Sequence, residues 1–149
     1  MVHDLEYDLT NKLLDRIDNM EFDDKGNLYI ALGDNTNPFE AFGVGPSDFR
    51  EGRAAHDAYR SSANTQDFRG KILRITPKAD GSYSIPEGNL FNDKSQGLPE
   101  IYVMGTRNPY TLAFDPQEQT LYYGDVGPDA KADDTAHGSR GFDEVNRVN

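Results

Sequence analysis

A strand–turn–strand unit that ends in Gly-Asp occurs twice in this chain, and it limits the folds open to the sequence. The first copy covers residues 20–34 and the second covers residues 110–125. In each copy, apolar and aromatic runs flank a polar turn, which is typical of a β-hairpin. Aligned, the copies match at Phe22-Asp23 with Phe114-Asp115 and at Gly33-Asp34 with Gly124-Asp125. Repeated hairpins of this kind predict blades of a β-propeller.

The rest of the chain is also typical of an all-β protein. Residues 71–75, 101–104 and 142–148 are rich in β-branched or aromatic side chains, which favours strands. The 14 glycines and 8 prolines in 149 residues favour turns over long helices. Only residues 8–17 show helical spacing, and residues 53–59 could form one helical turn. We therefore expect antiparallel propeller blades with long loops and a short N-terminal helix.

The length of the chain sets how many blades it can supply. Propeller repeats run about 40–50 residues, and closed propellers have about 4–8 blades. Two long irregular segments, 34–69 and 128–141, use up part of the 149 residues. The remainder supplies about two blades, which cannot close a ring and would leave exposed edge strands. We therefore expect a piece of a larger protein, or a chain that needs a partner.

Composition excludes several classes of partner. The net charge is −11, from 15 Lys and Arg against 26 Asp and Glu. Nucleic acids and anionic membranes need a basic face, so we expect neither as a partner. The chain has no cysteine, which excludes disulfides and Cys-based zinc sites. No apolar run reaches transmembrane length, and because residues 1–17 are charged and broken we expect no signal peptide within them.

Two strand ends carry residues suited to a cofactor. Arg107 offers a planar fork of donors that suits a carboxylate or quinone oxygen, and Asn108 follows it. Gly127 and Pro128 offer turn carbonyls beside Asp129, which suits a hard cation such as Ca²⁺. An ordinary Asn-Pro turn and an ordinary Gly-Pro turn would explain the same residues without function.

Eight short motifs in a fixed order connect the chain to a known family. They lie at residues 33–39, 60–65, 69–75, 85–91, 99–102, 105–109, 124–129 and 141–146. In this order they resemble the glucose/sorbosone dehydrogenase family, the soluble quinoproteins. The resemblance covers about residues 19–148, which is most of the chain.

The resemblance implies a fold, a reaction and a cofactor set. It implies a six-bladed propeller that carries pyrroloquinoline quinone (PQQ) and Ca²⁺ and oxidises an aldose sugar at its anomeric carbon, with hydride transfer to the quinone. It further implies an electron acceptor such as a cytochrome and a periplasmic or extracellular location. By the same resemblance, Arg107 and Asn108 match the cofactor-contacting pair, and Gly127 and Pro128 match the pair whose carbonyls bind Ca²⁺. Asp34 matches the acidic residue that steadies the catalytic histidine.

The chain departs from the family's pattern near its N-terminus. The position of the family's histidine base falls at about Asp15, where no histidine stands. We therefore treat residues 1–18 as a divergent segment and residues 19–149 as a partial propeller domain. The departure leaves an alternative open: a non-catalytic propeller fragment that acts as a binding or interaction module.

Several other polar residues have simpler interpretations. His3, His56 and His137 are scattered without ligand spacing, and we expect all three on the surface or in loops. The acidic residues Asp129, Asp133 and Asp134 could add a Ca²⁺ ligand. A solvated run of charge explains them equally simply.

Overall fold

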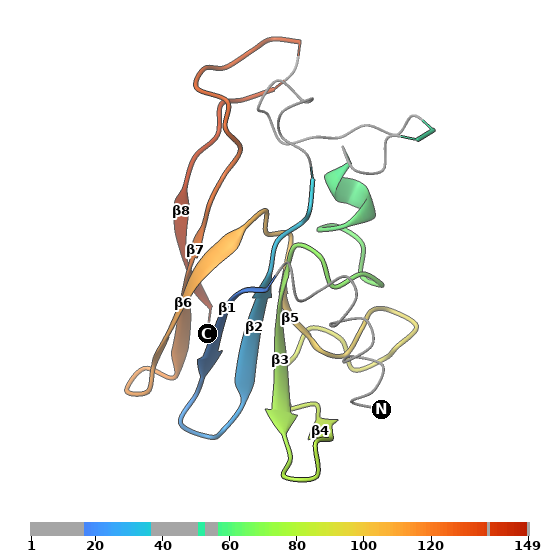
Figure 1. Ribbon diagram of the computed structural model, residues 1–149, viewed down its shortest axis with the longest axis vertical. Coiled ribbons are helices and arrows are strands. Elements are labelled where there is room, and N and C mark those ends of the chain that lie inside the picture. The colour runs from blue at the N-terminus through green and yellow to red at the C-terminus, as the bar shows by residue number, and fades with distance from the viewer. Residues whose placement is uncertain (1–16, 37–50, 53–56, 137, 149) are drawn as a thin grey trace.

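The computed structural model describes residues 17–36, 51–52, 57–136 and 138–148. These residues form two antiparallel β-sheets (Figure 1). The elements are β1 (Ile17–Phe22), β2 (Leu28–Leu32), the 3-10 helix η4 (Ala58–Arg60), β3 (Lys71–Pro77), β4 (Tyr83–Ser84), β5 (Ile101–Met104), β6 (Pro109–Asp115), β7 (Thr120–Asp125) and β8 (Glu144–Val148). No helix in this part of the chain is long and apolar enough to cross a membrane.

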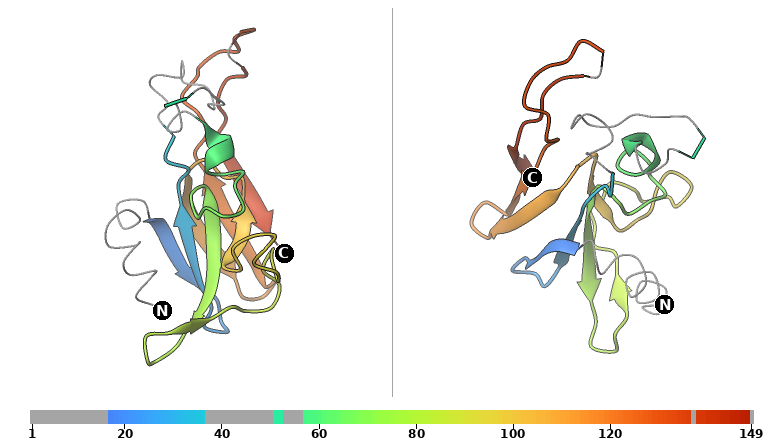
Figure 2. Two further views of the ribbon diagram at one scale, coloured as in Figure 1. Left: turned by 90° about the vertical axis from the view of Figure 1, so that its right-hand side faces the viewer. Right: turned by 45° about the horizontal axis from the view of Figure 1, so that its top comes forward.

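The two sheets correspond to neighbouring propeller blades. The first has the order β1-β2-β3-β5, with β4 paired to the far end of β3, and the second has the order β6-β7-β8. The two sheets lie at an angle to each other, and β6 of the second sheet lies beside β1 and β2 of the first (Figure 2). The expected all-β fold of antiparallel blades is therefore confirmed. The described residues supply four strands and a short fifth for one blade, and three strands for the next.

Most expected strands form where the pattern predicts them, and the differences are local. The last strand begins at Glu144 rather than at residue 142, and β4 is too short to produce a readable pattern. Ile17, expected at the end of a helix, is instead the first residue of β1. The rest of that expected helix lies outside the described residues. The expected helical turn near 53–59 overlaps η4, although residues 53–56 also lie outside the described part.

The internal repeat is preserved in strand register. Phe22 pairs with Leu28 across the first hairpin, and Phe114 pairs with Leu121 across the second. Both turns begin with an aspartate whose side chain accepts backbone N–H bonds within the turn. A carboxylate that caps its own turn in this way fixes the loop geometry. The repeat in the sequence thus reflects a repeat of local hydrogen bonding.

Both hairpins also carry a β-bulge at the same place. The register of β1 shifts between Ile17 and Asn19, and that of β6 shifts between Pro109 and Thr111. The extra residues are Asp18 and Tyr110, which are equivalent in the repeat. The Asn19 amide donates a 3.4 Å hydrogen bond to the Tyr110 carbonyl, so the two bulges lie side by side. Bulges re-aim side chains, and these two lie at the strand ends that border the candidate site.

Two hydrophobic clusters lie on opposite faces of the first sheet, because side chains alternate along a strand. One cluster, here called the blade core, consists of Ile30, Leu32, Leu73, Ile75 and Ile101. The other, here called the junction core, consists of Tyr29, Ala31, Ile72, Tyr102, Leu112 and Leu121. The junction core includes residues of both sheets and therefore joins the blades. At its centre, the Tyr29 ring meets those of Tyr102 at 5.4 Å and Phe114 at 6.1 Å.

Candidate functional site

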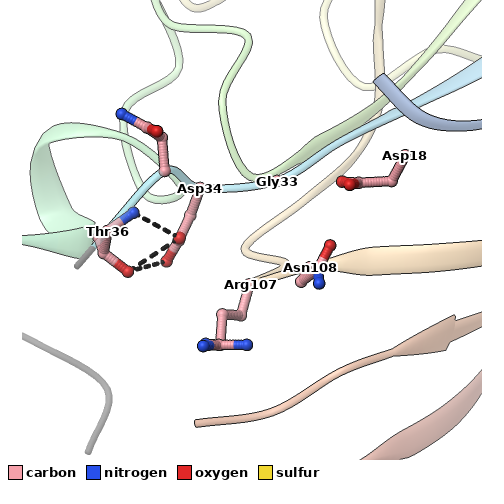
Figure 3. Close-up of a pocket in the computed structure, with 7 residues that line it drawn as sticks. Asp18, Gly33, Asp34, Thr36, Arg107 and Asn108 are labelled. Carbon is pink, nitrogen blue, oxygen red and sulfur yellow. Dashed lines mark hydrogen bonds between the residues drawn. The ribbon is translucent and has the colours of Figure 1, made fainter. Parts of the chain in front are cut away.

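A polar cavity lies where β2 ends and β6 begins (Figure 3). Its volume is about 200 Å³. The described residues that line it are Asp18, Gly33, Asp34, Asn35, Thr36, Arg107 and Asn108. Three residues singled out in the sequence, Asp34, Arg107 and Asn108, are therefore brought together here from two different blades.

Main-chain hydrogen bonds set the separation of the two walls of the cavity, which are residues 33–36 and residues 107–108. The Asp34 N–H donates to the Arg107 carbonyl at 2.7 Å. Gly70 lies between the same two segments, where its N–H donates to the Gly33 carbonyl and its own carbonyl accepts from Thr106 N–H. The cavity is therefore framed by backbone rather than by long side chains, which makes its geometry well defined.

Asp34 is a buried carboxylate, with only 5% of its surface exposed. Its oxygens accept hydrogen bonds of 2.8 Å from the Thr36 N–H and 2.9 Å from the Thr36 hydroxyl, as the dashed lines in Figure 3 show. Burial raises the pKa of Asp34, while the Thr36 bonds and the positive charges of Arg107 and Arg69 act in the opposite direction. The group is thus held in one orientation and binds a proton more readily than an exposed aspartate does.

Arg107 and Asn108 are positioned by Asp125, the aspartate of the second Gly-Asp pair. Its carboxylate accepts the Arg107 N–H at 3.1 Å and the Asn108 N–H at 2.7 Å. Burial raises the pKa of Asp125, and these two N–H bonds oppose the rise. The Arg107 guanidinium donates to the Val126 carbonyl at 3.0 Å and lies 4.0 Å from Asp129. Asp125, which sequence reasoning identified only as part of a repeat, therefore holds the backbone of the predicted clamp.

Gly127 and Pro128 lie beside this cavity rather than in its described wall. The Val126 N–H donates to the Asn108 carbonyl at 2.8 Å, and the Gly127 N–H donates to Asp143 at 3.0 Å. A side-chain carbon at Gly127 would fall 2.0 Å from the Phe142 carbonyl oxygen. Only glycine permits this approach of the two ends of the β7–β8 connection, so the Gly-Pro pair is fixed next to Arg107 and Asn108.

Asp18 is a residue of this site that sequence reasoning missed. Its Oδ2 atom is buried and makes no hydrogen bond to any described residue. Burial raises the pKa of Asp18, and the Gly33 N–H opposes the rise. The bulge places the side chain against the cavity. Alignment of the two hairpins pairs Asp18 with Tyr110, but no feature of the sequence alone marks either position as a bulge.

Other predicted positions lie elsewhere or outside the described residues. Asp15, His3, His56 and His137 all lie outside that part of the chain. In the β7–β8 connection, the Asp133 and Asp134 carboxylates accept N–H bonds from their own loop. These bonds account for the two acidic residues as loop-forming groups.

The residues that line the cavity supply the hydrogen-bond donors that a quinone cofactor would need. Arg107 and Asn108 place a guanidinium and an amide on the cavity wall, which suits an anionic, carbonyl-rich molecule. Among the described residues, no group of three or more His, Asp or Glu side chains could hold a metal ion. A Ca²⁺ site here would therefore depend on backbone carbonyls, such as those of Gly127 and Pro128, and on ligand oxygens.

Several known proteins resemble this chain in sequence. Residues 15–149 match the sequence profile of the family described as Glucose / Sorbosone dehydrogenase. The aldose sugar dehydrogenase YliI of Escherichia coli is 30% identical over 126 residues, which cover 84% of this chain and 24% of that protein. An uncharacterized protein of Synechocystis sp. is 34% identical over 122 residues, which cover 81% of this chain and 23% of that protein.

A solved structure shows the same similarity in three dimensions. The soluble aldose sugar dehydrogenase of Escherichia coli, in its apo form, superposes with a TM-score of 0.51 at 29% identity. The match covers 86% of this chain and 26% of that structure. The chain thus spans about a quarter of the length of these relatives. Since the family profile matches nearly the whole sequence, the chain belongs to the glucose/sorbosone dehydrogenase family.

Proposed function

We propose that this chain is part of a PQQ- and Ca²⁺-dependent aldose dehydrogenase. The observation that carries the proposal is the single cavity that gathers Asp34, Arg107 and Asn108 from two blades, with Gly127 and Pro128 next to it. When bound, the quinone with its Ca²⁺ would supply the acceptor for the hydride that leaves the anomeric carbon of the sugar.

The residues of this chain have different roles in such a site. Arg107 and Asn108 bind the cofactor, because a guanidinium and an amide offer several donors to carboxylate and quinone oxygens. The carbonyls of Gly127 and Pro128 hold the cation. Asp34 is held in place by hydrogen bonds from Thr36. Its carboxylate has the role of orienting the histidine base that the family's pattern includes. The sugar substrate, the electron acceptor and a location outside the cytoplasm belong to the same proposal.

The test is a titration of the protein at its full natural length with PQQ and Ca²⁺, followed by quinone absorbance. We expect micromolar binding, loss of binding when Ca²⁺ is chelated, and dye reduction on addition of an aldose. Arg107→Ala should weaken binding by about 100-fold, as expected for loss of a charge-assisted contact. Arg147→Ala is the matched control, because Arg147 pairs with Glu118 on the exposed surface of the same blade.

A non-catalytic binding module is the second candidate. It is favoured by the cavity wall itself, which contains no histidine among the described residues. The same titration separates the two. Quinone binding without sugar-dependent dye reduction supports the binding module, and no quinone binding at all contradicts the dehydrogenase proposal.

A further inference from the structure

A lysine with no role in the proposed chemistry is completely buried beside the site. Lys71, the first residue of β3, has 0% of its surface exposed. Its ammonium group donates three hydrogen bonds, to the carbonyls of Ser61 at 2.9 Å, Ser62 at 2.8 Å and Arg69 at 2.8 Å. All three N–H donors are thus matched by an acceptor, which is the condition for burying a charge without a large loss of stability.

The acceptors of Lys71 are neutral backbone carbonyls, an environment like that of a bound monovalent cation. The Ser61 and Ser62 carbonyls directly follow the 3-10 helix η4, and the Ser61 carbonyl also accepts a 2.9 Å hydrogen bond from the Asn64 N–H. Burial lowers the pKa of Lys71 to about 8, and the charge of Asp67 opposes that effect. The ammonium form therefore predominates at neutral pH.

Lys71 lies at the level in the sheet where the site begins. It pairs with Leu32 on β2 and with Met104 on β5, the last residues of these two strands. The chain continues from Leu32 directly into Gly33-Asp34, and from Met104 into the segment that carries Arg107. Lys71 is thus the central one of three strand ends from which both walls of the cavity emerge.

The three carbonyls that accept from the Lys71 ammonium group are here called the carbonyl cage. The residue before Lys71, Gly70, connects this cage to both walls of the cavity. Gly70 N–H donates to Gly33 at 3.0 Å, and its carbonyl accepts from Gly105 and Thr106 at 3.2 Å each. Gly70 has a φ of +64°, and an added side-chain carbon would fall 2.3 Å from Ser62 Cβ. The segment held by the Lys71 ammonium group therefore lies directly against the residue that joins the two walls.

We propose that Lys71 is a positioning residue, whose ammonium group acts as a built-in cation that holds residues 61–69 against Gly70 and thereby sets the separation of Asp34 and Arg107. The importance of this separation for cofactor binding rests on the proposed function. The carbonyl cage itself does not depend on any cofactor.

Three variants of the protein at its full natural length test this proposal. Lys71→Met keeps the length and removes the charge, and Lys71→Ala leaves room for a small cation. Lys78→Met, at an exposed position just after the same strand, is the control. We expect each Lys71 variant to lower Tm by about 10 °C, because buried carbonyls lose their donors. We also expect shifted NMR signals for the Asp34 carboxyl and the Arg107 guanidinium, and no change for Lys78→Met.

Chemical rescue separates positioning by a cation from general stabilisation. Ammonium or potassium chloride should restore part of the Tm of Lys71→Ala and return the Asp34 and Arg107 signals toward those of the unmodified protein. Tetramethylammonium chloride at the same ionic strength is too large for the cage and should restore neither. Equal rescue by all three salts, or unchanged Asp34 and Arg107 signals in both variants, would overturn the proposal.

A measurement on the unmodified protein covers the case in which neither variant folds. In ¹⁵N NMR spectra near pH 6, the Lys71 ammonium should give a signal with slowly exchanging protons. A rapidly exchanging amine would contradict the cage. Quinone binding is read separately in absorbance, so a protein that binds no PQQ but keeps this ammonium signal contradicts only the proposed function.

Discussion

The N–H of Asp34 donates a 2.7 Å hydrogen bond to the carbonyl oxygen of Arg107. This bond joins the end of the second strand in one blade to the segment that leads into the first strand of the next. The acidic and basic groups of the candidate site are therefore fixed to each other through main chain, and their side chains need only short reaches.

Asp125→Ala should misplace the Arg107-Asn108 backbone. The substitution leaves two backbone N–H groups without their carboxylate acceptor, which costs about 2–4 kcal/mol at about 1–3 kcal/mol per buried group, with partial relief by water. Asp125→Asn should lower the free energy of unfolding by less, because its one amide oxygen can still accept a backbone hydrogen bond. Urea unfolding measures the loss. An equal effect of the two substitutions would show that the N–H bonds do not account for it.

Asp34→Asn should raise the free energy of unfolding at pH 7. Burial raises the pKa of Asp34 above its ordinary 3.8, so the folded state binds the proton more tightly than the unfolded state does. That stabilising contribution is complete below pH 3.8 and is lost as the pH rises through the folded pKa. The free energy of unfolding of the variant should thus increase relative to that of the original protein as the pH rises from 4 to 7. Urea unfolding at each pH measures this difference.

Asp80→Asn provides the control of opposite sign. Hydrogen bonds from Ser82 lower the pKa of the exposed Asp80 carboxylate. Its stabilising contribution is present above pH 3.8 and is lost as the pH falls through the folded pKa. This variant should be slightly less stable than the original at pH 7 and equal to it in acid. If both substitutions shift stability in the same direction with pH, the assigned cause is wrong.

Gly70→Ala should be far more damaging than another substitution at a positive φ. A methyl group at Gly70 would meet Ser62 Cβ at 2.3 Å and the Thr106 carbonyl oxygen at 2.6 Å. Backbone strain and overpacking together should cost about 2–5 kcal/mol. Gly26 also has a positive φ, of +80°, but nothing lies within 4 Å of the added carbon. Gly26→Ala should therefore lose only about 1 kcal/mol, and thermal unfolding of the pair separates the two effects.

Leu121→Ala should loosen the contact between blades. Leu121 is 1% exposed in the junction core, and its truncation should cost about 2–5 kcal/mol. Leu73→Ala in the blade core should cost a similar amount, since Leu73 is 2% exposed. Hydrogen exchange distinguishes them: only Leu121→Ala should speed exchange of the Asp34 N–H. Equal acceleration by both would show that the blades unfold as one unit.

The fold was largely predictable because its signals are local. The strand at residues 101–104 was predicted at the bounds observed, and the hairpins predicted within residues 20–34 and 110–125 form there, since their strands are short apolar runs closed by turn residues. The repeat was also readable, because Asp23 and Asp115 form the same kind of turn. In contrast, β4 has two residues and depends on its pairing with β3, which no local pattern reveals.

The site was predictable only in part, because some of its contacts join distant segments. Arg107 and Asn108 stand out by residue type and by motif, and the structure places them beside Asp34. Asp18 gives no such signal, and Lys71 lies within the motif at residues 69–75 without standing out by its residue type. Asp18 enters the cavity through a bulge, which depends on the register between strands, and an isolated lysine in a sequence is expected on the surface. Both results arise from tertiary contacts that override the average behaviour of the residue type.

The bulge at Tyr110 also makes the length of its segment a constraint. If Tyr110 were deleted, Pro109 could still pair with Asp125 and Thr111 with Gly124, but β6 would lose the local bend that the bulge produces. Arg107 and Asn108, which precede this bend, would then be displaced relative to Asp34. Substitution of Tyr110, which is 59% exposed, leaves the register intact. In alignments of related sequences, a gap at this position would therefore be a stronger sign of a lost site than a change of the residue itself.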